Sequence, residues 1–170
     1  RLDKDVEHII GFFVNTLVNR LQFKDEDTLA TLFNAVQKEL VASQDHQNIP
    51  FDKIVEVVQP EREASITPIF QVMINYASIE ERLNLKGTTT SVETLQYDKA
   101  KFDLSFDFMD TADNGLMLLL GYNTDLFKET TIQRLLESLE LIVSVFIDTP
   151  EEKIKTLNVL SQAEEQKLLI

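Results

Sequence analysis

The stretch from residue 101 to residue 122 constrains the fold most, because its pattern predicts two strands joined by a tight turn. Apolar and polar side chains alternate through KFDLSFDFM, and such a period of two is typical of a strand with one buried face. NGLMLLLGYN is predicted to pair with it as a hairpin around the turn-forming stretch DTADNG. A sheet with an apolar face must be covered by a second layer. The inward-facing residues are Phe102, Leu104, Phe106 and Phe108.

Amphipathic helices are predicted to supply that layer. The first follows an Asp- and Thr-rich cap near residue 28, and the second runs from about Glu129 to Ile147. A shorter helix is predicted to begin at Pro50 as its first residue and to end at Gln59–Pro60, because the residue before a proline avoids the helical region. The apolar positions are Leu29, Leu32, Phe33, Val36 and Leu40 in the first long helix, and Ile132, Leu135, Leu136, Leu139, Val143 and Phe146 in the second.

Three further strands are expected at residues 9–22, 69–77 and 91–97, and a capping box at Ser161 and Glu164 is expected to open a last short helix. IIGFFVNTLVNR is apolar on both of its alternating faces, which predicts a central strand covered on two sides. The expected fold class is therefore α+β, with a mixed sheet packed with amphipathic helices.

Asn15 is the anomaly in that predicted central strand, where it would lie deep between Phe13 and Leu17. A buried amide costs free energy unless it finds hydrogen-bond partners. Either neighbouring backbone groups satisfy Asn15, or it faces a cavity where chemistry takes place.

Composition and motifs exclude several kinds of function. The formal charge is −13, from 16 basic and 29 acidic side chains, which makes nucleic-acid binding unfavourable. The longest apolar run is too short for a membrane span and lacks the basic start of a signal peptide. No metal site is expected, because the two histidines, His8 and His46, show no zinc-ligand spacing, and no cysteine is available.

We expect a soluble cytoplasmic domain. Because Arg1 comes first, we also expect an excised segment or a processed product.

Three short stretches, in order, give the chain a family resemblance. IGFFVNTLVNR (10–20), HQNIPFD (46–52) and REASITPIFQVM (62–73) resemble motifs of nonribosomal peptide synthetase condensation domains, which run roughly [IV]GxFVNT, HQDxPFE and RDxSxxPLFQV. KFDLSF, YNTDLF and LNVLSQAEEQKLL resemble later segments of that family. The departures from the motifs are small: Asn48, Asp52 and Glu63 replace Asp, Glu and Asp, and Ile66 and Thr67 replace Arg and Asn.

The family's catalytic motif, HHxxxDG, is absent from this sequence, so no catalytic residue is assigned here. The resemblance implies that residues 1–160 are the C-terminal lobe of a chloramphenicol-acetyltransferase-like fold, and that residues 161–170 begin a linker toward a following domain. It implies a parent reaction in which a carrier-bound amine attacks a carrier-bound thioester. The implied partners are a missing N-terminal lobe, peptidyl carrier proteins with their phosphopantetheine arms, and an adenylation domain; no cofactor is bound directly. The isolated chain should be inactive and should expose an apolar face where the other lobe docks.

The resemblance also suggests roles for single residues. Asn15 belongs to the VNT motif, which lies near the substrate tunnel between the lobes; the alternative is that Asn15 ties down a backbone turn. Arg62 is interpreted as a structural partner of carboxylates. His46 and Gln47 are interpreted as residues that fix a loop, with partner contact as the alternative. The remaining motif residues interpreted as structural are Gly11, Thr16, Pro50, Phe51, Ser65 and Pro68.

More than one function remains open at this point. Epimerisation and heterocyclisation domains have the same fold, but they usually carry FTS-like residues where this chain has Val14-Asn15-Thr16. Two hypotheses from different classes are a lobe that only docks a carrier protein and a lobe that is purely structural.

Overall fold

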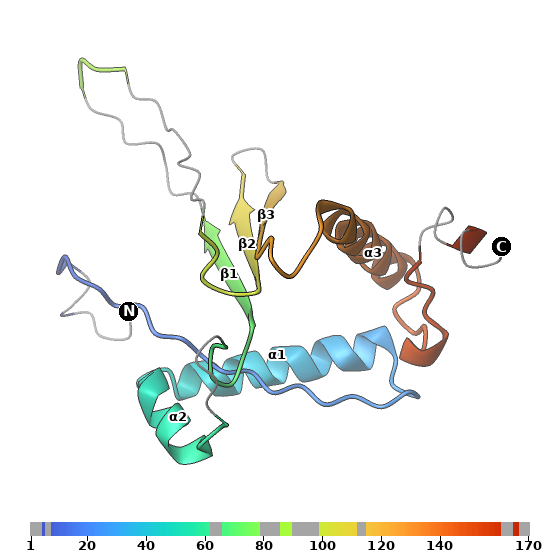
Figure 1. Cartoon of the computed structure of the whole chain (residues 1–170), viewed down its shortest axis with the longest axis horizontal. Coiled ribbons are helices and arrows are strands. Elements are labelled where there is room, and N and C mark those ends of the chain that lie inside the picture. Colours follow the sequence, from blue (N-terminus) through green and yellow to red (C-terminus); the bar gives the residue numbers. More distant parts are fainter. Residues whose placement is uncertain are drawn as a thin grey trace. The chain divides into compact units, whose positions relative to one another are not determined.

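The computed structural model describes residue 5 and residues 8–61, 66–78, 86–89, 99–111, 115–160 and 165–166. The chain divides into two compact units. Figure 1 shows the helices and strands in order along the chain. Unit 1 comprises Arg1–Glu61 and Ser138–Ile170, and unit 2 comprises Arg62–Glu137. The chain thus leaves unit 1, builds unit 2, and returns to unit 1.

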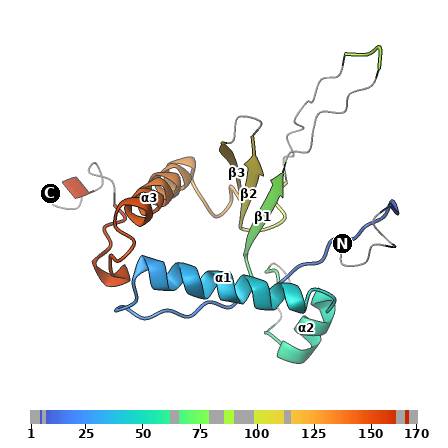
Figure 2. The same ribbon diagram turned by 180° about the vertical axis from the view of Figure 1, so that it is seen from behind.

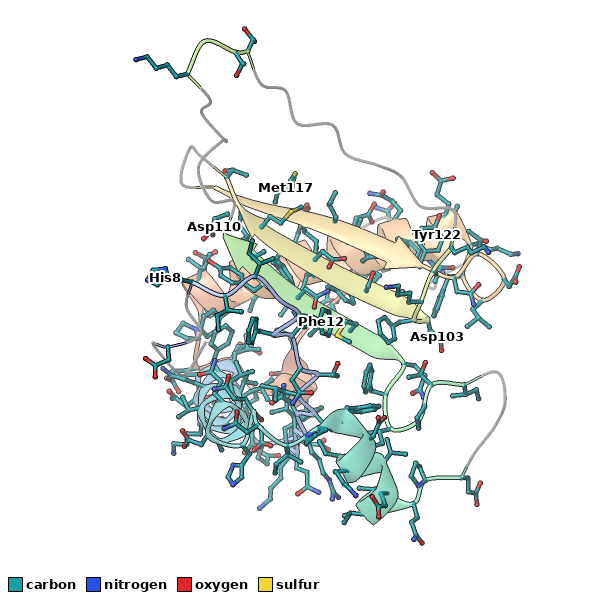
Figure 3. The ribbon with its side chains drawn as sticks, turned by 90° about the vertical axis from the view of Figure 1, so that its left-hand side faces the viewer. His8, Phe12, Asp103, Asp110, Met117 and Tyr122 are labelled. Atoms are coloured by element: carbon teal, nitrogen blue, oxygen red, sulfur yellow. The ribbon has the colours of Figure 1, made fainter. Side chains whose placement is uncertain are left out.

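Unit 2 contains a mixed three-stranded sheet of β1 (Val72–Ser78), β2 (Leu104–Asp110) and β3 (Leu116–Tyr122) in the order β1-β2-β3 (Figure 2). β1 pairs with β2 in parallel, and β2 pairs with β3 antiparallel. This confirms the predicted hairpin, and the strand expected at residues 69–77 is present but begins three residues later, at Val72. Figure 3 labels Asp103 and Tyr122 at one end of the sheet and Asp110 and Met117 at the other.

The register of the sheet separates an apolar face from a mixed one, as the alternation in the sequence predicted. Ile74 lies opposite Phe106, which lies opposite Leu120. Beyond β3, the Asn123 N–H donates to the Asp103 carbonyl oxygen at 3.0 Å, and at the hairpin end the Thr111 N–H donates to Gly115 at 2.9 Å. The apolar face carries Val72, Ile74, Tyr76, Leu104, Phe106, Phe108, Leu116, Leu118, Leu120 and Tyr122.

In unit 1, helix α1 (Leu29–Asp45) begins behind a well-formed cap. The Thr28 Oγ1 accepts the Thr31 N–H at 3.2 Å, and the Thr31 Oγ1 accepts the Thr28 N–H at 2.8 Å. The first two amides of the helix, at Leu29 and Ala30, donate to the carbonyl oxygens of Glu152 and Pro150. The amides that a helix start leaves unpaired are thereby satisfied, partly by a segment far along the chain. The predicted helix and cap are confirmed.

The helices predicted to begin at Pro50 and near Glu129 are also present. Helix α2 spans Phe51–Val58, with Pro50 as the extended residue just before it, so the helix begins one position later than predicted. Helix α3 spans Glu129–Asp148 and belongs to both units, and a short 3-10 helix, η2, spans Ile154–Thr156. The Phe33 ring of α1 stacks on the Phe146 ring of α3, with centroids 4.1 Å apart.

The predicted central strand at residues 9–22 is wrong. These residues form no strand with any described residue, and the segment runs alongside α1 (Figure 1). A strand needs a neighbour that accepts and donates backbone hydrogen bonds, and an alternating pattern cannot supply one. The predicted burial on both sides is wrong as well, because Ile10 is 101 % exposed and Phe12 is 89 % exposed.

Few side chains are buried in the part of the chain that the structure describes. Leu29 and Ile132 are the buried apolar residues, while Phe33 remains 58 % exposed despite its ring partner. The strand expected at 91–97, the capping box of Ser161 and Glu164, and most of the expected linker lie outside the described residues.

Candidate functional site

The side-chain amide of Asn15 joins two of the motif segments. Its Nδ2 donates to the carbonyl oxygen of Gln47 at 2.7 Å and to that of Ile49 at 2.7 Å. Its Oδ1 accepts the N–H of Thr16 at 3.0 Å. Both N–H groups and the oxygen of the amide are therefore in use. We call Asn15 with these three backbone partners the Asn15 clamp.

The predicted depth of Asn15 is wrong, because its side chain is exposed in this structure. The reason is the missing strand: the segment that carries Asn15 lies along α1 and is not covered on both sides. The contacts match the alternative in which the amide ties down a backbone turn. The proposed place of Asn15 near a substrate tunnel stays a prediction.

The turn that the clamp holds follows directly from α1. His46 ends the helix, and its N–H donates to the Ser43 carbonyl oxygen at 3.1 Å. The Nδ1 of His46 lies 2.9 Å from the Ala42 carbonyl oxygen, and because a carbonyl oxygen only accepts, Nδ1 is the donor in this contact. The Nε2 of Gln47 donates to Gln44 at 2.8 Å. Both side chains thus bond to the last turn of α1, which is the geometry that a loop-fixing role requires.

Helix α2 then begins at Phe51, directly after Pro50. The N–H of Ile49 donates to the His46 carbonyl oxygen at 3.0 Å, and the N–H of Lys53 donates to Pro50 at 2.9 Å. The residues from the end of α1 to the start of α2 therefore form a continuous series of hydrogen-bonded turns, and the Asn15 clamp holds its middle.

The other predicted site residues divide between three places. Gly11 lies on the segment ahead of Asn15, where a Cβ atom would stand 2.9 Å from the Phe13 ring. Thr16 is half-buried next to Asn15. Pro68 belongs to unit 2, and Arg62 and Ser65 lie outside the described residues. The structure thus brings together the first two motif segments, through Asn15.

A second polar cluster in unit 1 escaped sequence analysis. The Glu26 carboxylate accepts hydrogen bonds from the Lys153 Nζ at 2.6 Å and from the Lys155 Nζ. Hydrogen bonds from Lys153 and then Lys155 hold the pKa of Glu26 below its ordinary value. Glu26 is one of 29 acidic residues, and no local pattern marked it. All three side chains are at least 47 % exposed, so water screens the attraction.

Two polar pairs link β1 to β2 in unit 2. The Asn75 Nδ2 donates to Asp107 at 2.7 Å, and the Tyr76 hydroxyl donates to Asp110 at 2.6 Å. The bond to Asp110 raises the pKa of the Tyr76 phenol, because ionising Tyr76 would remove the shared proton beside a carboxylate. The alternation in the sequence predicted that Asp107 lies on the polar face. Its partner could not be predicted, because the register of the neighbouring strand was unknown.

Apolar side chains lie exposed on the segment that leads to Asn15. The exposed fractions are 50 % for Ile9, 89 % for Phe12 (labelled in Figure 3) and 73 % for Val14. Val57 and Val58 of α2 are exposed as well, at 82 % and 57 %. Exposed apolar surface of this kind is typical of a face that another chain or domain covers.

The described residues hold no group of three or more His, Asp or Glu side chains that could bind a metal ion. Nor does any helix in the described ranges have the length and apolar character needed to cross a membrane.

The family model of the condensation domain matches residues 1–169. Malpinin synthetase of Mortierella alpina is 36 % identical over 166 residues, which are 97 % of this chain and 2 % of that protein. Gramicidin S synthase 2 of Brevibacillus brevis is 33 % identical over 171 residues, 99 % of this chain and 4 % of that protein. The chain therefore spans a few per cent of the length of these relatives.

A crystal structure of a four-domain nonribosomal peptide synthetase bound to AMP and glycine has the same fold, with a TM-score of 0.83. The superposition covers 97 % of this chain and 14 % of that one, at 24 % sequence identity. The expected α+β fold class is confirmed.

Proposed function

This chain belongs to the condensation-domain family of nonribosomal peptide synthetases, and from that membership we propose that it is part of a domain that forms amide bonds. The donor is an aminoacyl or peptidyl thioester on one carrier protein, and the acceptor is an aminoacyl group on another. The acceptor amine attacks the thioester carbonyl carbon, the C–N bond forms, the C–S bond breaks, and the carrier thiol leaves with a proton. Positioning of the two substrates and transfer of that proton are the expected sources of rate.

The observation that carries this proposal is the family match over residues 1–169. The HHxxxDG motif is absent, so the proton-handling group must come from elsewhere in the domain. We assign this chain the C-terminal lobe, with the N-terminal lobe, the carrier proteins and an adenylation domain as its partners. The phosphopantetheine arms of the carriers deliver the substrates, and the chain binds no cofactor of its own.

The Asn15 clamp is the part of the chain to which we assign a role in that reaction. It fixes the turn between α1 and α2 through two carbonyl oxygens, so the turn cannot move without breaking two hydrogen bonds. A fixed turn can present backbone or side-chain groups to a substrate at a constant distance. Asn15 then acts by holding the turn, by facing the substrate directly, or by both.

The proposal can be tested with a synthetase module that contains this chain together with an HHxxxDG-bearing lobe. Two carrier proteins, loaded with aminoacyl groups, are supplied in excess, and the dipeptidyl carrier is measured by mass spectrometry. We expect product from the module and none above the buffer background from this chain alone.

Two outcomes would contradict the proposal. Amide formation by the isolated chain would show that the missing motif is not needed. A module that binds both loaded carriers but forms no product would favour a carrier-docking or purely structural lobe. A control module with both histidines of HHxxxDG replaced by Ala distinguishes enzymatic from spontaneous product.

A further inference from the structure

The backbone at Ile69 is strained. Its φ angle is 74°, in the left-handed region that glycine adopts freely and β-branched residues avoid. The N–H of Phe70 donates to the carbonyl oxygen of Pro68 at 3.0 Å, which closes a three-residue γ-turn centred on Ile69. A γ-turn with positive φ is rare and costly. A glycine at this position would avoid that cost, so the presence of Ile requires a reason.

The other left-handed non-glycine residue among those described is Gln59, with a φ angle of 47°. Its conformation has an ordinary cause, because Gln59 ends helix α2 and its N–H donates to the Val55 carbonyl oxygen at 2.9 Å. Helices commonly end in this way. Ile69 ends no helix, and it lies just ahead of β1. Backbone strain without a structural cause points to a role in function.

Contacts on both sides hold the Ile69 turn in place. The Nε2 of Gln71 donates to the Thr67 carbonyl oxygen at 3.1 Å, which closes the turn from end to end. The carbonyl oxygen of Gln71 accepts the N–H of Leu104 at 3.3 Å. The rings of Phe70 and Phe102 lie 5.5 Å apart at a tilt of 36°. The turn is therefore joined to the residues where β2 begins.

This position matters because β1 and β2 are parallel. A hairpin sets the register of an antiparallel pair, but parallel strands have no short turn between them. The register pairs Val72 with Leu104, and the cross-strand pairs Asn75–Asp107 and Tyr76–Asp110 form in that register. A slip by one residue would move these side chains to the opposite faces of the sheet. The Ile69 turn opposes a slip at the start of the pairing, and the two polar pairs oppose it further along.

We propose that Ile69 is a positioning residue for the condensation reaction: its strained γ-turn fixes where β1 enters the sheet beside β2. The role rests on the proposed function. Ile69 acts through Gln71 and Phe70, which hold the start of β2. A β-branched side chain suits this task, because its restricted rotamers and backbone leave the turn fewer alternatives than glycine would.

The test uses the complete synthetase module with loaded carriers. Ile69→Gly removes the strain and loosens the turn, so we expect kcat to fall about tenfold or more. The KM for the carriers should not rise, and the melting temperature should not fall. Ile69→Val keeps the β-branched side chain and should retain the activity. Gln59→Gly relaxes the left-handed residue at the end of α2 and should leave kcat unchanged.

Hydrogen exchange supplies a readout that does not depend on catalysis. The Leu104 amide, which donates to Gln71, should exchange faster in Ile69→Gly than in the unmodified module. Unchanged exchange of the Leu104 amide together with a normal kcat would show that the strain at Ile69 has no positioning role. A fall in kcat that only follows a fall in melting temperature would reduce Ile69 to a packing residue. If the unmodified module forms no amide bond, the proposed function fails, while Leu104 exchange still tests the positioning role.

Discussion

Units 1 and 2 are held together by different kinds of contact. In unit 2, a continuous ladder of backbone hydrogen bonds joins three strands, and each residue adds a small share. In unit 1, single side chains join segments that are far apart in the sequence, as Asn15 does for Gln47 and Ile49, 32 and 34 residues away. Losing one hydrogen bond of the ladder leaves the neighbouring bonds in place. Losing the one side chain that joins two distant segments removes their whole connection. Point substitutions should therefore reduce stability more in unit 1 than in unit 2.

The largest effects are expected at Asn15, where Asn15→Ala is the first variant to test. Two hydrogen bonds to exposed carbonyl oxygens are lost, which should cost about 1–2 kcal/mol of unfolding free energy. In the complete module, condensation should fall by more than this stability loss explains, because the turn between α1 and α2 is released. Activity and melting temperature should be measured on the same preparation.

Asn15→Asp is the matched control for that substitution. It keeps the oxygen that accepts the Thr16 N–H, but it places a carboxylate oxygen against the carbonyl oxygens of Gln47 and Ile49. We expect it to be more damaging than Asn15→Ala. An Asn15→Asp variant as stable as the wild type would show that the contacts to the two carbonyl oxygens do not contribute to stability. A lower melting temperature with near-normal turnover in Asn15→Ala would leave the clamp a purely structural role.

A smaller effect is expected in the ladder of unit 2 for Gly121→Ala. The new Cβ would stand 2.6 Å from the Ser105 Oγ but 3.9 Å from the Ser105 Cβ. Because the hydroxyl can rotate away, the cost should be about 1 kcal/mol, at the low end for overpacking. The double variant Gly121→Ala with Ser105→Ala should recover the loss, as measured by urea denaturation. A loss that persists in the double variant would contradict the steric explanation.

The smallest effect is expected for Glu26→Gln. Because its lysine partners lower the pKa of Glu26 from 4.5, the ionised pair stabilises the folded chain above about pH 4.5 and loses this effect as the pH falls through the lowered pKa. The melting temperature of Glu26→Gln should lie slightly below that of the wild type at pH 7, and the two should converge below pH 4.5. Added salt should shrink the difference at pH 7. A difference that is constant across this pH range would exclude the ion pair as its source.

The sequence predicted the features of the fold that local patterns determine. The hairpin from KFDLSFDFM to NGLMLLLGYN and the helices at α1, α2 and α3 each follow from periodicity, caps and turn residues within their own segments. The strand at residues 9–22 failed for the opposite reason. Its residues are apolar on both alternating faces, but a strand exists only with a partner strand, and the segment itself does not specify one.

The candidate site was predictable in part for the same reason. Asn15 was conspicuous as an amide in an apolar stretch, and the need for hydrogen-bond partners followed from its chemistry. The partners themselves are carbonyl oxygens, which every residue carries, so no side-chain pattern could point to Gln47 and Ile49. The Ile69 turn was equally hidden, because nothing about Ile suggests a positive φ angle.

The pairing of the α1 start with residues 150–156 has a consequence for synthesis on the ribosome. Glu26 and Lys153 are 127 residues apart, and the amides of Leu29 and Ala30 find their acceptors at Glu152 and Pro150. All of unit 2 is translated between these two halves of unit 1. The leading amides of the nascent helix therefore stay bound to water until residues 150–156 have left the exit tunnel. Because domains generally fold as units during translation, we expect unit 2 to acquire its structure first and unit 1 to close around its late-arriving segment.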